Sequence, residues 1–100
     1  MKSSIQREAE RTTLRVEGEL DALSAPTLRP TIDEIVGDRP KEVVVDLSAL
    51  RMIDSSGVGA IVSLYKRLRT TECNVRIEGV AGQPLAIFRV LKLDRVFQIG

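Results

Sequence analysis

Residues 43–59 read VVVDLSALRMIDSSGVG, and this stretch decides how the chain is expected to fold. It begins in a short β-branched run, 42–47, that lacks polar alternation, as is typical of a strand covered on both faces or central in a sheet. A loop follows, and then a helical pattern over 58–69, whose predicted buried stripe is Val58, Ile61, Val62, Tyr65 and Leu68. A buried strand, a loop and an amphipathic helix in this order predict one unit of an α/β sheet.

Most of the remaining chain continues the same alternation of strands and helices. Residues 13–17 alternate apolar and polar side chains, as a half-buried strand does, and a shorter strand over 5–7 is expected to pair with them as a hairpin. Downstream, 74–78 is predicted as a strand and 83–91 as a helix that buries Leu85, Phe88 and Leu91. Residues 96–99 are expected to form a last strand or a tail.

One more helix is predicted over 26–36, where apolar residues recur at helical spacing. Ser24 can cap this helix, and Gly37 is expected to end it. Pro30 removes one helical hydrogen bond, so the sequence predicts a loose first turn or a kink there.

The order of elements, β-β-α-β-α-β-α, predicts a single α/β domain over 1–100. We expect a mixed sheet of four or five strands, antiparallel at the N-terminal hairpin and parallel afterwards, with right-handed crossovers. The helices should lie mainly on one face of the sheet. Fold class alone does not give function.

Composition argues against several classes of function. The chain carries 15 basic and 14 acidic residues, a net charge of +1, so a general electrostatic grip on nucleic acid or anionic membrane is not expected. It has no histidine, which removes the usual general base, the commonest metal ligand and the Ser-His-Asp triad. Cys73 is the only cysteine, which fits a reducing cytoplasm. No apolar run approaches the ~20 residues of a membrane helix, and the polar start is not a signal peptide, so we expect a cytoplasmic protein without cofactor, metal or membrane insertion.

The Asp-Ser-Ser-Gly sequence at the start of the 58–69 helix is the candidate site. The first turn of a helix has free N–H groups and the positive end of the helix dipole, so it favours an anion. Gly57 has no side chain, so it leaves space in this turn and lets the backbone approach a neighbouring segment closely. From the residues alone an alternative stays open, in which Asp54, Ser55 or Ser56 is merely the N-cap.

The motifs of the chain resemble a known family. DSSGVG at 54–59, preceded by VDLS at 45–48 and by GELD at 18–21, is similar to the STAS domain of anti-sigma factor antagonists. The resemblance covers nearly the whole chain, from Leu14 to Phe97, with one helix and one strand between the first motif and the last. It implies a bacterial regulator of transcription that works by partner switching.

The resemblance also implies the roles of single residues. Ser55 matches the phosphoacceptor, and a partner serine kinase, which is also the anti-sigma factor or its relative, would supply ATP and the catalytic base. A phosphatase would reverse the reaction, and the chain itself would be no enzyme. The partner-binding positions implied are Asp21, Asp54, Ser56 and Gly57, with Ser56 also as the helix cap. For Asp21 a turn or cap role stays open, and Asp46 is expected to be structural, holding the loop that follows it.

The sequence leaves two alternatives to the switch. The chain could instead be a scaffold subunit of a lipid-transport or stress-signalling complex, which would need no phosphate. An enzyme is disfavoured because no histidine and no obvious lysine stands beside Ser55 to activate it. Many family members continue into a final amphipathic helix, whereas the printed sequence ends at Gly100, so any partner contact made by such a helix is left open.

Overall fold

The computed structural model describes residues 1–99, in which three helices and six strands build one layered domain. In chain order these elements are β1 (Lys2–Glu8), β2 (Arg11–Leu20), α1 (Ala25–Gly37), β3 (Glu42–Asp46), β4 (Leu50–Ile53), α2 (Ser55–Arg69), β5 (Asn74–Glu78), α3 (Gly82–Val90) and β6 (Gln98–Ile99).

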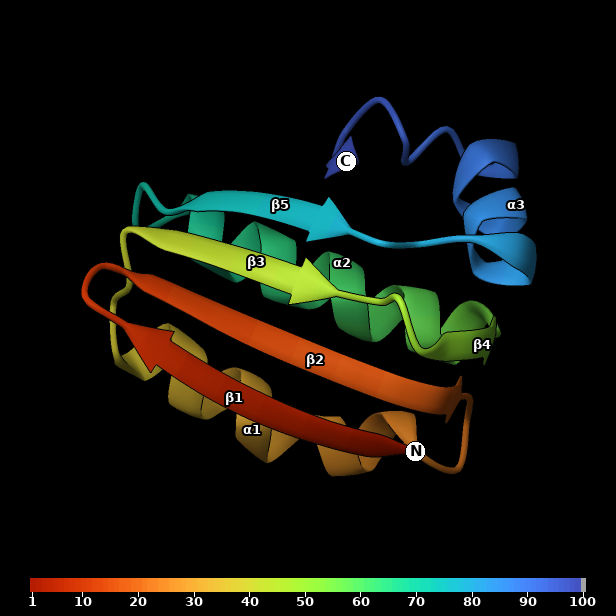
Figure 1. The fold of residues 1–100 in the computed structure, drawn as a ribbon, viewed down its shortest axis with the longest axis horizontal. Coiled ribbons are helices and arrows are strands. Elements are labelled where there is room, and N and C mark those ends of the chain that lie inside the picture. Colours follow the sequence, from red (N-terminus) through yellow and green to blue (C-terminus); the bar gives the residue numbers. More distant parts are fainter. Residues whose placement is uncertain (100) are drawn as a thin grey trace.

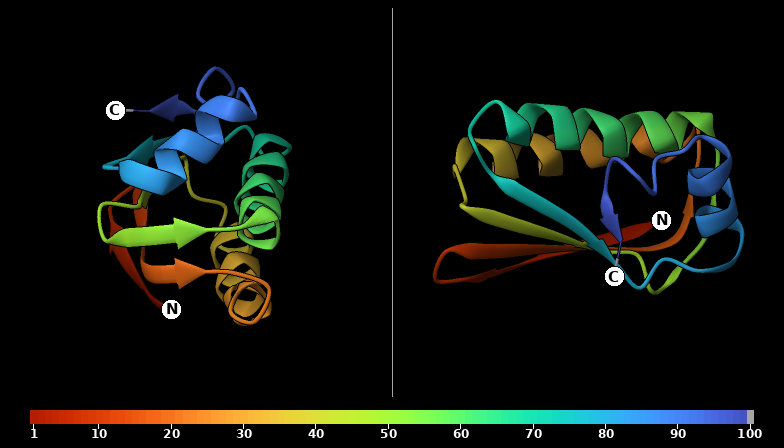
Figure 2. Two further views of the ribbon diagram at one scale, coloured as in Figure 1. Left: turned by 90° about the vertical axis from the view of Figure 1, so that its right-hand side faces the viewer. Right: turned by 90° about the horizontal axis from the view of Figure 1, so that it is seen from above.

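The sheet runs in the order β1-β2-β3-β5-β6, and β4 pairs with the second half of β2 (Figure 1). Strands β1 and β2 are antiparallel, and all the other pairs are parallel. Helices α1 and α2 run side by side along one face of the sheet and leave its other face open, while α3 lies at one end (Figure 2). The predicted mixed sheet with an antiparallel hairpin and helices mainly on one face is therefore confirmed.

The core lies between the sheet and the two long helices. Alternation along β2 sends Leu14, Val16 and Leu20 inward, all 0% exposed. Helix α2 closes the core with a stripe at helical spacing: Val58, Ile61, Leu64 and Leu68. Burial of one such side chain contributes about 1.5–3 kcal/mol. This core determines how α2 sits on the sheet, and so where the first turn of α2 lies.

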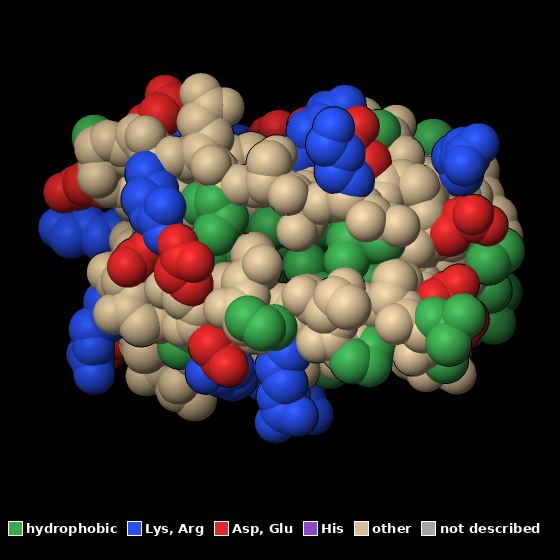
Figure 3. All heavy atoms as spheres, turned by 90° about the horizontal axis from the view of Figure 1, so that it is seen from below, with side chains coloured by type: hydrophobic (Ala, Val, Ile, Leu, Met, Phe, Trp, Pro, Cys, Tyr) green, Lys and Arg blue, Asp and Glu red, His purple; other side chains and the backbone are tan. Residues whose placement is uncertain are grey.

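The edge of the molecule at β1 is closed by ion pairs to α1. Arg7 on β1 reaches Glu34 on α1 and Asp38 just beyond the end of α1, with nitrogen–oxygen distances of 2.5 and 2.8 Å. Apolar side chains remain visible between the charged groups on this side of the molecule (Figure 3). Because the Arg7 side chain is 48% exposed, these pairs orient the hairpin more than they stabilise it.

The strands extend further than the sequence predicted. Both strands of the hairpin are longer than 5–7 and 13–17, and β4 falls in a stretch predicted to be a loop. Only the first and last of the four residues of β4 are buried, so its pattern lacks the alternation that marks a strand. Pairing with β2 makes it a strand, which is a tertiary effect.

The helix α1 extends one residue beyond the predicted 26–36 at each end, and its predicted end at Gly37 is confirmed. The Ser24 side chain makes no capping hydrogen bond, because its hydroxyl instead donates to the Glu19 carbonyl near the end of β2 and accepts from the Asp21 amide. Gly37 is the last helical residue, and Asp38 follows as the C-cap. The helix runs unbroken through Pro30, since the missing N–H would have bonded to Pro26 in the exposed first turn.

The other two helices also shift against their predicted bounds. Helix α2 begins at Ser55, so the Asp-Ser-Ser-Gly motif lies within its first turn, and Leu64 belongs to its buried stripe. Val62 and Tyr65 are only half-buried. Helix α3 ends at Val90, and Leu91 just beyond it is 52% exposed, so its predicted burial is wrong.

Candidate functional site

The carboxyl ends of β2 and β4 lie next to each other and bring two motifs together. In the parallel pairing of these strands Leu20 is opposite Ile53, so Asp21 and Asp54 are the first residues beyond a shared end of the sheet. The amide of Asp54 donates to the carbonyl of Leu20 at 3.2 Å, which ties the two chain segments at this point. The structure thus gathers acidic positions that are more than 30 residues apart in the sequence.

Asp54 is the N-cap of α2. Its backbone is extended, and its Oδ1 accepts a hydrogen bond from the amide of Gly57 at 3.0 Å. Its Oδ2 accepts from the amide of Ala22 at 3.1 Å, in the loop after β2. The prediction that Ser56 caps the helix is therefore wrong, because the carboxylate of Asp54 already binds the amide that a cap would satisfy.

Ser55 and Ser56 are both exposed in the first turn of α2. Ser56 lines a groove of about 650 Å³ between α1 and α2. Arg29 also lines this groove, and an ion pair of 2.6 Å joins Arg67 to Asp33 at its wall. Ser55 is not among the residues that line it. The two hydroxyls therefore have different surroundings although they are adjacent in the sequence.

The loop after β2 is folded around the half-buried Asp21. Its Oδ1 accepts from the amides of Leu23 and Ser24, both at 3.0 Å, and lies 3.1 Å from the Ser24 hydroxyl. Hydrogen bonds from the backbone and side chain of Ser24 lower the pKa of Asp21 below its ordinary value. Asp21 is thus an ionised turn residue, the role that the sequence left open. Beside it the loop presents the Leu23 side chain, 89% exposed.

Gly57 lies inside the molecule and not on the exposed surface of the site. A Cβ at this position would come within 2.5 Å of the Leu20 carbonyl oxygen and 2.7 Å of the Ile53 side chain. The glycine lets the first turn of α2 pack against the ends of β2 and β4. Any effect of Gly57 on a partner surface therefore comes from where it places the first turn of α2, and not from direct contact with the partner.

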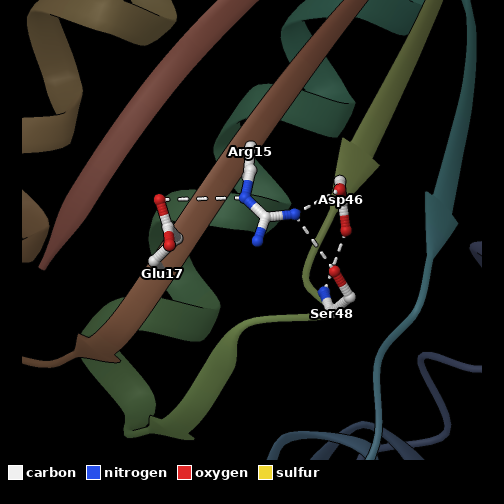
Figure 4. A network of polar contacts seen from close by, with 4 residues as sticks. All are labelled: Arg15, Glu17, Asp46 and Ser48. Carbon is white, nitrogen blue, oxygen red and sulfur yellow. Dashed lines mark hydrogen bonds and ion pairs between the residues drawn. The ribbon is translucent and has the colours of Figure 1, made fainter.

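Asp46 belongs to a separate polar network on the open face of the sheet (Figure 4). Its Oδ1 accepts from the amide of Ser48 at 2.9 Å, and its Oδ2 accepts from Arg15 at 3.0 Å. Arg15 also lies 3.7 Å from Glu17. Partial burial would raise the pKa of Asp46, but the bonds from Ser48 and Arg15 outweigh it and hold that pKa below its usual range. The predicted structural role of Asp46, holding the following loop, is confirmed.

One residue near the site, Gln83, is not predicted by any pattern in the sequence. The side-chain amide of Gln83 on α3 accepts from the amide of Ile53 and donates to the carbonyl of the same residue, each at 2.9 Å. No motif or spacing links positions 53 and 83, so only the folded chain reveals this contact.

Neither a cluster of metal-binding side chains nor a membrane-spanning helix is present in residues 1–99, the part of the chain that the structure describes. Residues 1–99 hold no group of three or more His, Cys, Asp or Glu side chains that could bind a metal ion. Over the same residues, no helix is both long and apolar enough to cross a membrane.

Comparison with known proteins gives a consistent family match. The family model described as the STAS domain matches residues 3–100. A curated relative from Mycobacterium tuberculosis, the anti-sigma-F factor antagonist RsfB, is 28% identical over 88 residues, which are 86% of this chain and 70% of the relative.

Two solved structures share the fold. An anti-sigma factor antagonist from Mycobacterium paratuberculosis superposes with a TM-score of 0.90 at 24% identity, covering 98% of this chain and 83% of that one. The Bacillus cell fate determinant SpoIIAA in its phosphorylated form superposes with a TM-score of 0.77 at 18% identity, covering 99% of this chain and 91% of that one.

Proposed function

The chain belongs to the STAS domain family, and we propose that it is an anti-sigma factor antagonist switched by phosphorylation of Ser55. The single observation that carries the proposal is the exposed Ser55 in the first turn of α2, beside the acidic N-cap Asp54. The unphosphorylated chain would capture an anti-sigma factor and so release a sigma factor.

The partner supplies the chemistry in this proposal. With no histidine in the sequence, the chain has no usual base to activate the Ser55 hydroxyl. A serine kinase that is also the anti-sigma factor would bring ATP and the base, and a phosphatase would restore the bare hydroxyl. Both reactions would take place in the cytoplasm. The phosphorylated form of SpoIIAA, a protein of the same fold, supports this type of regulation.

A phosphate on Ser55 is expected to leave the fold intact because of where this residue lies. A phosphoserine adds roughly −1.5 to −2 charges at neutral pH. The helix dipole and the free amides of the first turn offset part of its repulsion from Asp54. We therefore expect the stability of the domain to change by no more than about 1 kcal/mol.

Partner binding should respond more strongly than folding. An interface that fits the bare serine meets, after phosphorylation, a bulky dianion close to the carboxylates of Asp54 and Asp21. Like-charge or steric mismatch at an interface costs several kcal/mol. A loss of about 2.8 kcal/mol already lowers affinity a hundredfold.

The test uses the anti-sigma factor from the same genome and three variants. Ser55→Ala should bind the partner as wild type does and accept no phosphate. Ser55→Asp should melt near the wild-type temperature and bind about a hundredfold more weakly. Ser56→Ala is the matched control, and it should keep both binding and phosphorylation.

Two results would overturn the proposal. One is equal partner affinity of Ser55→Asp and wild type, measured by calorimetric titration. The other is phosphate found on Ser56 of the Ser55→Ala protein by mass spectrometry. A chain that binds its partner without ever accepting phosphate would instead act as a scaffold.

A further inference from the structure

Strand β4 is held on two sides at its last residue. On one side it pairs with β2, where Ile53 is opposite Leu20. On the other side the Gln83 amide receives the Ile53 N–H and donates to the Ile53 carbonyl, both at 2.9 Å. We name these two hydrogen bonds the Gln83 clamp. A primary amide carries the same donor and acceptor as a peptide group, so Gln83 acts as one residue of a neighbouring strand.

The clamp satisfies polar groups that water does not reach. Ile53 is 1% exposed, and its side chain belongs to the hydrophobic core. A buried backbone N–H or carbonyl without a partner is strongly disfavoured. Removing the Gln83 amide would therefore allow the end of β4 to move until its backbone groups found water or another partner.

The next residues along the chain are Asp54 and Ser55, so the clamp acts directly on the candidate site. Asp54 is already tied to the β2 side, through its amide to Leu20 and through its carboxylate to Ala22. Gln83 restrains the same segment from the α3 side. The first turn of α2 is thus fixed from two directions by parts of the chain that are distant in sequence.

We propose that Gln83 is a positioning residue for Ser55: through Ile53 it holds the start of α2 in the geometry that a kinase must meet, which makes α3 part of the switch. Transfer of a phosphoryl group needs the acceptor hydroxyl to be aligned closely with its donor. The consequence for phosphorylation rests on the function proposed above. The restraint on Ile53 does not.

The test compares two substitutions at Gln83 with a matched control. Gln83→Met keeps the length of the side chain and its apolar stem but removes both hydrogen bonds, and Gln83→Glu keeps the acceptor and removes the donor. Gln6→Met makes the same chemical change at an exposed position of β1. Thermal melting and the exchange protection of the Leu64 and Leu68 amides establish that each variant is folded.

The first readout is amide hydrogen exchange at Ile53, measured by NMR on the full chain. Gln83→Met should exchange this proton about tenfold faster than wild type or more, the scale expected when one hydrogen bond is lost, whereas Gln83→Glu keeps the oxygen that accepts the Ile53 N–H and should exchange it closer to the wild-type rate. Gln6→Met should match wild type. Unchanged exchange at Ile53 in Gln83→Met would show that the amide does not restrain the site.

The second readout is steady-state phosphorylation of Ser55 by the anti-sigma factor from the same genome. Gln83→Met should lose roughly tenfold in kcat/KM, mostly in kcat, because the loop after β2 that contains Asp21 is untouched, and Gln83→Glu should lose less because it keeps one of the two bonds. Phosphorylation at the wild-type rate would overturn the positioning role. If wild type itself accepts no phosphate, the proposed function fails instead, and exchange at Ile53 still decides whether the clamp holds the start of α2.

Discussion

At the scale of single residues, Asp54 sets the local geometry of the site through two hydrogen bonds. One carboxylate oxygen caps α2 through the Gly57 amide, and the other holds the Ala22 amide of the loop after β2. The same side chain therefore orients Ser55 and joins it to the loop that contains Asp21. Asp54 is only half-buried, so the exposed part of its side chain also contributes charge to the surface that a partner would meet.

Removal of the Asp54 carboxylate should destabilise the domain. We expect Asp54→Ala to lower the free energy of unfolding by about 0.5–2 kcal/mol, since the helix loses its cap. Asp54→Asn keeps one oxygen that can accept from Gly57 but places an NH2 group where Oδ2 accepts from Ala22, so it should lose less than Asp54→Ala without matching wild type. Urea unfolding followed by circular dichroism measures both. Equal losses in the two variants would contradict the capping role.

Asp21 should titrate below an ordinary aspartate. Ser24 donates to its carboxylate from both backbone and side chain, which lowers the pKa in the folded state. A depressed folded pKa contributes stability above the unfolded value of about 3.9, and this contribution disappears as the pH falls through the folded pKa. Ser24→Ala should therefore move the Asp21 pKa upward, as measured by NMR titration. An unchanged pKa in the variant would contradict the contribution of the Ser24 hydroxyl, since the Ser24 amide remains as a donor.

At the scale of elements, the junction of α2 with β2 and β4 depends on one glycine. The Cβ of Gly57→Ala would lie 2.5 Å from the Leu20 carbonyl oxygen, so the first turn of α2 would have to move. We expect a loss of about 1–3 kcal/mol, the usual range for overpacking, and weaker partner binding because Ser55 moves with the turn.

The neighbouring glycine in α2 supplies the control. A Cβ on Gly59 meets no atom within 4 Å. Alanine in a helix interior is favoured over glycine by about 0.5–1 kcal/mol, so Gly59→Ala should stabilise the domain. Chemical denaturation of the two variants should give changes of opposite sign. Two changes of the same sign would contradict the packing assigned to Gly57.

At the scale of the whole molecule, Phe97 joins the C-terminal part to the rest. The centroid of its ring lies 5.0 Å from that of Tyr65 on α2 and 5.8 Å from that of Phe88 on α3, both in edge-to-face geometry. The residue is 3% exposed. Phe97→Ala should cost about 3–5 kcal/mol, whereas Val96→Ala, at a side chain 50% exposed, should change stability by less than about 0.5 kcal/mol.

The course of unfolding provides a further check on Phe97. If its ring couples α3 and β6 to the core, wild type should unfold in a single transition, as small domains usually do. Urea titration followed by both fluorescence of Tyr65 and circular dichroism measures this. Separate transitions for the two signals in wild type would contradict the coupling.

The sequence by itself determined the order of elements apart from β4, together with the hairpin, the central strand and the position of Ser55 at the start of a helix. These features follow from local signals: the β-branched run of β3, the alternation along β2 and the helical spacing of apolar residues in α2. The motif at 54–59 also carried the family resemblance, which the family match bears out.

Only the tertiary structure decided how the site is held together. Strand β4 exists because β2 offers it a partner, and its own four residues carry no strand pattern. Asp54 and not Ser56 became the cap, because the pairing of β2 with β4 places its carboxylate between Gly57 and Ala22. The contact of Gln83 with Ile53 joins residues 30 positions apart. Local propensity extends over a few neighbouring residues, whereas these bonds form between segments that meet only after the sheet has closed.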